Sequence, residues 1–149
     1  MSLAKRDLSK IDMIVIHCSA TKASMKNVDA AWIDREHRKR GFLKIGYHFF
    51  IKRDGTIETG RALEEVGSHA VGFNQHSIGI CMAGGLDENM KAENNFTGDQ
   101  WVSLSALVGE LHLRFPTAQV LGHRDLPKVA KDCPCWDVKP WFAKHFLKK

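Results

Sequence analysis

Short apolar segments of strand length alternate along this chain with amphipathic segments of helix length. The longest apolar run covers about four residues, Met13 to Ile16, and similar short runs recur after positions 45, 77 and 118. Runs of this length suit strands buried on both faces. The alternation predicts an α/β domain whose central mixed β-sheet is flanked by about three α-helices. It argues against a membrane-spanning helix, which needs about 20 apolar residues.

Strands are expected where β-branched and aromatic residues gather, over residues 12–17, 45–52, 77–83 and 118–121. The dipeptide Asp54-Gly55 predicts a tight turn into a short strand at 56–58. Residues 60–76 show no clear periodicity. One hairpin among strands that are otherwise separated by helices makes the predicted sheet mixed rather than purely parallel.

Capping residues and apolar periodicity predict three helices. Asn27 is expected to cap a helix over residues 28–40. Thr97 and Gln100 form a capping box that opens the most regular helix. The apolar stripe of that helix consists of Trp101, Leu104, Leu107, Val108, Leu111 and Phe115. Asp137 is expected to cap a terminal helix, which is anchored by Trp141, Phe142 and Phe146.

The length fits one domain with a core of its own. The 149 residues are 44% hydrophobic and 26% charged, a globular composition that excludes collagen-like and largely disordered chains. A chain of this size builds a sufficient core without disulfide staples. We therefore expect a single domain over residues 1–149, with residues 1–10 as a loose N-terminal arm.

The chain is basic. Lys and Arg number 22 against 17 Asp and Glu, giving a formal net charge of +5 and a pI of about 9.1. Such a surface serves solubility, or it attracts an anionic partner such as nucleic acid, a membrane surface or an anionic cell-wall polymer. The charge alone leaves these alternatives open.

The start of the chain indicates synthesis in the cytoplasm, and its cysteines do not suggest a disulfide framework. The opening residues MSLAKRDLSK carry charge but no apolar segment typical of a signal peptide. The four cysteines are scattered, and Cys133 and Cys135 stand too close for an easy bridge. Reduced thiols or metal ligands are therefore expected rather than a disulfide framework.

Three residues with metal-binding side chains follow predicted strands. His17 ends the first strand, His123 stands just after the strand at 118–121, and Cys133 follows ten residues later. Functional sites in open α/β sheets gather at the carboxyl ends of strands. Two His and one Cys leave one position open on a tetrahedral zinc, which is the catalytic pattern. Each residue alone is more often structural, and the spacing is not that of a compact zinc finger.

Seven short strings in a fixed order add a family resemblance: His17-Cys18-Ser19-Ala20-Thr21, Ile45-Gly46-Tyr47-His48-Phe49, Asp54-Gly55-Thr56, Gly67-Ser68-His69-Ala70, Asn74-Gln75-His76-Ser77-Ile78-Gly79-Ile80, Gly122-His123-Arg124-Asp125 and Lys131-Asp132-Cys133-Pro134. Together they resemble the zinc-dependent N-acetylmuramoyl-L-alanine amidases, whose superfamily includes the peptidoglycan recognition proteins. The similarity is greatest to small single-domain phage endolysins and extends from about residue 12 to 142. No single string would be specific.

The resemblance implies a role for six residues. One Zn²⁺ per chain would be held by His17, His123 and Cys133. Tyr47 matches the catalytic tyrosine, Lys131 matches the catalytic lysine of the phage branch, and His69 matches a histidine that lines the substrate cleft. Two departures are visible. Cys135 stands where a non-thiol residue is expected, and a longer loop before Cys133 leaves Lys128 as an alternative to Lys131.

The implied reaction hydrolyses the amide between the lactyl carbonyl of muramic acid and L-alanine. Zinc lowers the pKa of its water to roughly 7 and polarises the carbonyl. A lysine ammonium would stabilise the developing oxyanion. A tyrosine hydroxyl would orient the water or pass its proton on, and a free phenol with a pKa of about 10 is a poor simple base.

Four functional hypotheses remain. The first is a phage endolysin that acts on peptidoglycan as a monomer, after release from the host cytoplasm through a holin or similar leak. The second is a cytoplasmic amidase that recycles anhydro-muropeptides. The third is a non-catalytic peptidoglycan-binding module, which Cys133 disfavours because binding-only relatives typically lack that ligand. The fourth, a polymerase or nucleic-acid partner, has only the basic pI in its favour.

Other reactive side chains receive no functional role. His37, His112 and His145 fall in predicted helices, where they face solvent or pack. Strand alternation directs His48 and Cys18 away from the face of Tyr47 and His17, and Cys81 reads as a small buried hydrophobe. The four tryptophans are expected to anchor the core and helices.

Overall fold

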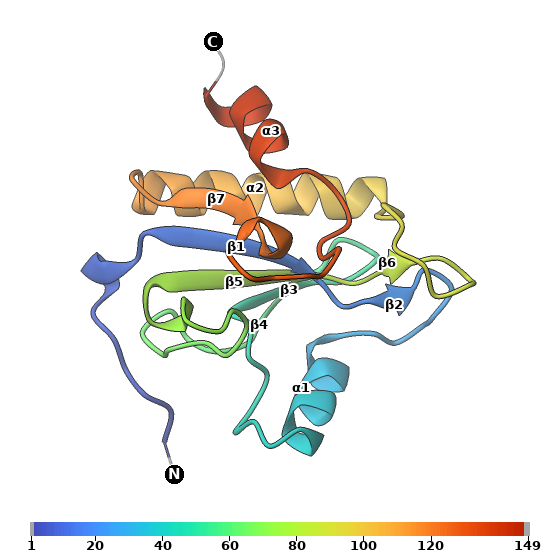
Figure 1. The fold of residues 1–149 in the computed structure, drawn as a ribbon, viewed down its shortest axis with the longest axis horizontal. Helices are drawn as coiled ribbons and strands as arrows, with labels where there is room; N and C mark the ends of the chain where they lie inside the picture. Colours follow the sequence, from blue (N-terminus) through green and yellow to red (C-terminus); the bar gives the residue numbers. More distant parts are fainter. Residues whose placement is uncertain (1, 148–149) are drawn as a thin grey trace.

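The computed structural model describes residues 2–147 as one domain around a five-stranded sheet, in the order β4-β3-β5-β1-β7 (Figure 1). The strands are β1 (Met13–Cys18), β3 (Phe49–Ile51), β4 (Ile57–Thr59), β5 (Ser77–Met82) and β7 (Gln119–Gly122). Only the β3–β4 hairpin is antiparallel, and the other three pairings are parallel. The predicted mixed sheet is therefore confirmed, including the turn at Asp54-Gly55.

The central strand β1 determines where the functional residues lie. It pairs in parallel with β5 on one side and β7 on the other, so that Val15 stands between Gly79 and Leu121. Ile14 and Ile16 pack in the cluster beneath α2 (Gly98–Arg114). Because successive side chains alternate between faces, His17 projects to the face opposite α2.

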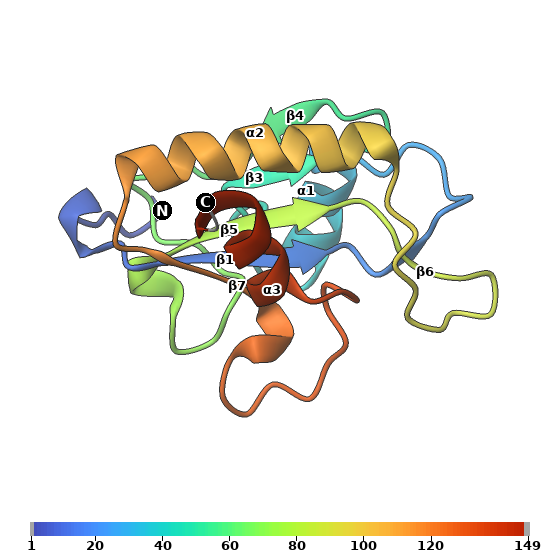
Figure 2. The same cartoon turned by 90° about the horizontal axis from the view of Figure 1, so that it is seen from above.

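Three helices flank the sheet. Figures 1 and 2 show α2 running along one face, with α3 (Val138–Phe142) beside it and α1 (Ala30–Lys39) on the opposite side. A π-helical turn, Ala143–Leu147, continues α3. Within residues 2–147, no helix is both long and apolar enough to cross a membrane.

The capping box of α2 forms as predicted. The Thr97 hydroxyl accepts from the Gln100 backbone N–H at 3.1 Å, and the Gln100 side-chain oxygen accepts from the Thr97 N–H at 3.0 Å. The Gln100 amide is fully buried and also donates to the carbonyls of Ile51 and Ala83. One residue thereby caps the start of the helix and joins it to the carboxyl ends of β3 and β5.

Of the other two predicted caps, the one at Asn27 is wrong, and Asp137 occupies its predicted N-cap position without making a capping bond. Helix α1 begins at Ala30, and Asp29 caps it by accepting from the Trp32 N–H at 2.8 Å. Asn27 instead occupies the left-handed region with φ 65°, where it cannot serve as an N-cap. Asp137 stands at the N-cap of α3 without a capping bond, because its carboxylate accepts from Arg124 at 2.6 Å.

The predicted strand over 45–52 is shorter in the structure, because the backbone of residues 45–47 bonds outside the sheet. The Gly46 carbonyl accepts from Ser68 and the Tyr47 carbonyl from Arg61. Two further strands that the sequence analysis missed, β2 (Thr21–Lys22) and β6 (Gly85–Leu86), form a separate parallel pair. Two-residue strands are too short to produce a periodic pattern.

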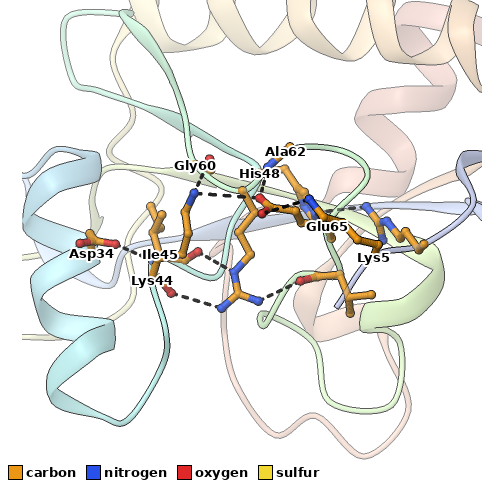
Figure 3. A network of polar contacts seen from close by, with 11 residues as sticks. Lys5, Asp34, Lys44, Ile45, His48, Gly60, Ala62 and Glu65 are labelled. Carbon is orange, nitrogen blue, oxygen red and sulfur yellow. Dashed lines mark hydrogen bonds and ion pairs between the residues drawn. The ribbon is translucent and has the colours of Figure 1, made fainter. Parts of the chain in front are cut away.

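The N-terminal segment contacts the domain instead of hanging loose. Arg6 donates side-chain hydrogen bonds to the carbonyls of Leu63, Asn74 and Ser77. Figure 3 shows the neighbouring network, in which the Glu65 carboxylate lies 3.7 Å from Lys5 Nζ and 4.0 Å from Lys44 Nζ. The buried Arg61 guanidinium donates to three carbonyls between positions 44 and 66. These contacts order the loop that precedes His69.

Candidate metal centre and active-site cleft

His17, His123 and Cys133 come together at one end of the sheet. His17 lies near the end of β1, His123 directly follows β7, and Cys133 lies in the loop before α3. Their ligand atoms all lie within 4.8 Å of one another. Because β1 and β7 are adjacent and parallel, their carboxyl ends necessarily meet at this point. The structure therefore brings together the three residues that the sequence analysis selected as ligands.

The chemistry of this donor set fits zinc. Two imidazoles and one thiol are ligand types that zinc prefers, and three protein ligands leave a fourth tetrahedral position for water or substrate. His17 is only 2% exposed, whereas the other two residues of the cluster are half-buried beside a cleft. An ion at this position would be held from below and would be open to the cleft above.

The structure separates the two neighbouring cysteines. The backbone N–H of Cys18 donates to Cys133 Sγ at 3.1 Å. Cys135 Sγ instead lies 3.9 Å from Cys18 Sγ and donates to the Gly85 carbonyl at 3.3 Å. Cys135 is therefore outside the three-residue ligand cluster. The contact with Cys133, together with burial, raises the pKa of the Cys18 thiol to about 12.

Tyr47 borders the cluster formed by His17, His123 and Cys133. Its ring centroid lies 5.0 Å from that of His17. The preceding residue, Gly46, must be glycine because a Cβ there would lie 2.0 Å from the Ser68 carbonyl oxygen. The Gly46 N–H also donates to His37 Nδ1 at 2.9 Å. These two contacts hold Gly46 and Tyr47 against the carboxyl end of β1, where His17 lies.

The phenol of Tyr47 is held in its protonated form. Burial raises its pKa well above the ordinary value, and the nearby thiols of Cys81 and Cys133 raise it further. A protonated phenol donates a hydrogen bond and cannot act as a general base.

His37, which received no functional role from the sequence, supports this segment. It lies on the buried side of α1, one turn after Ile33, and is 6% exposed. Its ring centroid is 5.4 Å from that of Tyr47. Helical spacing from Ile33 is the sequence signal that indicated burial, but the bond to Gly46 depends on the tertiary fold.

The imidazoles around the cluster are neutral. Burial lowers the pKa of His17 and His69 well below 6.5, and neighbouring positive groups lower each further. Burial and then the Lys131 ammonium lower the pKa of His123. Neutral imidazole is the form that binds a metal ion. The deprotonated ring nitrogens are therefore available at neutral pH.

A cleft of about 780 Å³ opens above the cluster. Its apolar wall includes Ala70, Val71, Phe73, Leu126, Val129 and Ala130. Both candidate lysines, Lys128 and Lys131, line it from the same loop, and Arg40 lines it too. Lys131 is close enough to contribute to the lowered pKa of both His17 and His123, whereas Lys128 is not among the contributing groups.

His48 makes the stability of the domain sensitive to acid. Its ring is fully buried, its Nδ1 accepts from the Gly79 N–H at 3.0 Å, and burial lowers its pKa to about 4. In the unfolded chain a histidine has a pKa of about 6.5. As the pH falls, His48 is therefore protonated in the unfolded chain before it is protonated in the folded one. The stabilising contribution is complete above pH 6.5 and is lost as the pH falls towards 4.

We therefore expect His48 alone to lower the free energy of unfolding by about 2 kcal/mol between pH 7 and pH 5. Urea unfolding in excess chelator, followed by tryptophan fluorescence at both pH values, measures this change. His48→Gln should flatten the pH dependence by that amount, and His145→Gln, at an exposed position, should leave it unchanged. Equal slopes in all three proteins would contradict the assignment.

The comparisons with known proteins agree with this geometry. The sequence model of the N-acetylmuramoyl-L-alanine amidase family matches residues 7–136. The endolysin of Escherichia phage T7 is 45% identical over 136 residues, which cover 91% of this chain and 88% of that protein. The endolysin of Klebsiella phage KP32 is 43% identical over 134 residues, 90% and 87% of the two chains.

A solved structure supports the same relationship. The N-acetylmuramoyl-L-alanine amidase LysC from Clostridium intestinale matches with a TM-score of 0.78 and 32% identity, covering 99% of this chain and 93% of that one. The resemblance seen in the sequence strings is thereby confirmed over nearly the whole chain. The chain belongs to the N-acetylmuramoyl-L-alanine amidase family.

Proposed function

We propose that this protein is a zinc-dependent phage endolysin that cleaves the amide between N-acetylmuramic acid and L-alanine in peptidoglycan. Membership of the amidase family and the endolysin relatives support this activity. The observation that carries the zinc assignment is the convergence of His17, His123 and Cys133 beneath an open cleft. The cysteine disfavours a module that only binds.

His17, His123 and Cys133 would hold the ion. When bound, zinc supplies the Lewis acidity that activates water and polarises the scissile carbonyl. The protein contributes the cleft, which places the substrate amide over the open side of the cluster. It also contributes two further groups beside the reacting atoms, Lys131 and Tyr47.

Lys131 is the proposed electrostatic catalyst. Its exposed side chain lines the cleft close enough to the cluster to affect two of the three ligands. A fixed positive charge there stabilises the negative charge that develops on the carbonyl oxygen. Lys128 lies earlier in the same loop, and its proposed role is to attract the anionic wall.

Tyr47 is the proposed hydrogen-bond donor. Its phenol remains protonated beside His17. It would orient the reacting carbonyl or water, and it would pass a proton towards the leaving amine of L-alanine. His69 lines the same cleft, and its proposed role is considered separately below.

The test is digestion of purified Gram-negative sacculi. We expect new L-alanine amino termini and no new reducing ends by mass spectrometry. Activity should disappear in excess chelator and return when zinc is added. New reducing ends would indicate a glycosidase, and full activity of the metal-free protein would refute the zinc assignment. Cleavage of small anhydro-muropeptides without cleavage of sacculi would favour a recycling amidase instead.

Delivery to the wall is also part of the proposal. We propose synthesis in the host cytoplasm, release through a holin lesion, and action as a monomer. The phage endolysin relatives support action on the wall after release. Lysis of host cells that express the protein only when a holin is co-expressed tests the release step, and native mass spectrometry tests the monomer.

A further inference from the structure

His69 uses both of its ring nitrogens inside the protein. Nδ1 lies 2.8 Å from His17 Nε2, and Nε2 lies 3.1 Å from the hydroxyl of Ser77. Ser77 is fully buried at the start of β5. A side chain whose two polar atoms are both engaged by buried neighbours has no ring nitrogen left to bind substrate.

The fold also builds a slot for this ring. A Cβ on Gly67 would lie 2.8 Å from the His69 ring, and a Cβ on Gly79 would lie 2.7 Å from it. The side-chain oxygen of Asn74 accepts from the backbone N–H groups of both His69 and Ala70, at 2.9 Å each. Ring and backbone are therefore both fixed, as expected for a group that orients another side chain.

The protons can be assigned from these contacts together with metal binding. If His17 binds an ion, its only nitrogen free to do so is Nδ1, because Nε2 is engaged by His69. Neutral His17 must then carry its proton on Nε2 and donate it to His69 Nδ1. His69 in turn carries its proton on Nε2 and donates it to the Ser77 oxygen.

We infer that His69 is a positioning residue that, with Ser77, holds His17 in the ring orientation and tautomer needed to bind the metal. This inference rests on the proposed metal site. It replaces the substrate contact that the sequence resemblance implied for His69. Partners that bond the second nitrogen of a ligand histidine typically affect metal affinity by about 10- to 100-fold.

The matched pair His69→Asn and His69→Leu separates the effect of the hydrogen bond between His69 and His17 from the effect of packing. The two side chains have similar size and shape, but only asparagine has an oxygen near the position of Nδ1. Zinc affinity of the whole protein is measured by competition with a chromogenic chelator, without substrate. We expect His69→Leu to weaken zinc binding by about 10- to 100-fold. His69→Asn should recover most of that loss.

A second variant and an optical signal complete the test. Ser77→Ala, a small change, should weaken zinc affinity in the same direction as His69→Leu. The thiolate-to-cobalt absorption of the cobalt-substituted protein should change in His69→Leu and be restored in His69→Asn. Thermal unfolding in excess chelator shows whether Asn and Leu destabilise the apoprotein equally.

Each contrary result has a distinct meaning. Wild-type zinc affinity in both His69 variants, with a raised KM, would overturn the inference in favour of substrate contact. An equal loss in both would overturn it in favour of simple packing. Absence of zinc binding by the wild-type protein would instead overturn the proposed function itself.

Discussion

Cys133→Ser is expected to reduce turnover to the background level of the chelated protein, whereas Cys135→Ser retains activity close to wild type. Cys133 Sγ belongs to the cluster whose ligand atoms lie within 4.8 Å of one another. A serine hydroxyl is a poor zinc ligand because it stays protonated at neutral pH and lacks the soft sulfur. Loss of this ligand should remove the ion and with it the chemistry that the ion supplies.

Cys135 is a matched control because it lies two residues away and carries the same thiol. Its sulfur lies against the Cys18 Sγ and the Gly85 carbonyl, outside the cluster of His17, His123 and Cys133. Zinc content by atomic emission and release of L-alanine termini are measured on both variants. The reverse pattern, with zinc lost only from Cys135→Ser, would show that the other sulfur is the ligand. His17→Ala and His123→Ala should reproduce the loss seen in Cys133→Ser.

Lys131→Ala is expected to lower turnover by about 10²- to 10³-fold while the protein keeps its full zinc content. This is the usual effect of removing one preorganised partner of a developing oxyanion. The side chain lines the cleft near His17 and His123 but is not among the clustered ligand residues. Turnover and bound zinc should therefore respond independently.

Lys128→Ala is the control for attraction to the anionic wall. Lys128 lines the same cleft from the same loop. On a small neutral muropeptide, the Lys131→Ala loss should persist at low and high salt, while Lys128→Ala remains near wild type. General electrostatic attraction is screened by salt, with a Debye length of about 10 Å at 0.1 M. Equal losses in the two variants, both imitated by salt, would refute a chemical role for Lys131.

The sequence by itself determined the mixed character of the sheet, the main helix and the positions of the candidate metal ligands along the chain. Regular elements follow local rules: a buried strand is a short apolar run, and a capping box such as Thr97 with Gln100 starts a helix. Once β1 and β7 are parallel neighbours, His17 and His123 must meet, because both lie at the carboxyl ends of their strands. The ordered strings around these residues identified the family.

Only the tertiary structure decided which side chains face one another outside the regular elements. Cys133 and Cys135 are two positions apart, yet the loop turns through a positive φ at Cys135. The Cys133 sulfur accepts from the backbone N–H of Cys18, whereas the Cys135 sulfur lies against the Cys18 Sγ and the Gly85 carbonyl. His37 and His69 gain their roles from contacts with residues 9 and 52 positions away. Such contacts depend on how loops pack against the sheet, and no local periodicity encodes them, because strand alternation predicts direction only where the backbone is a regular strand.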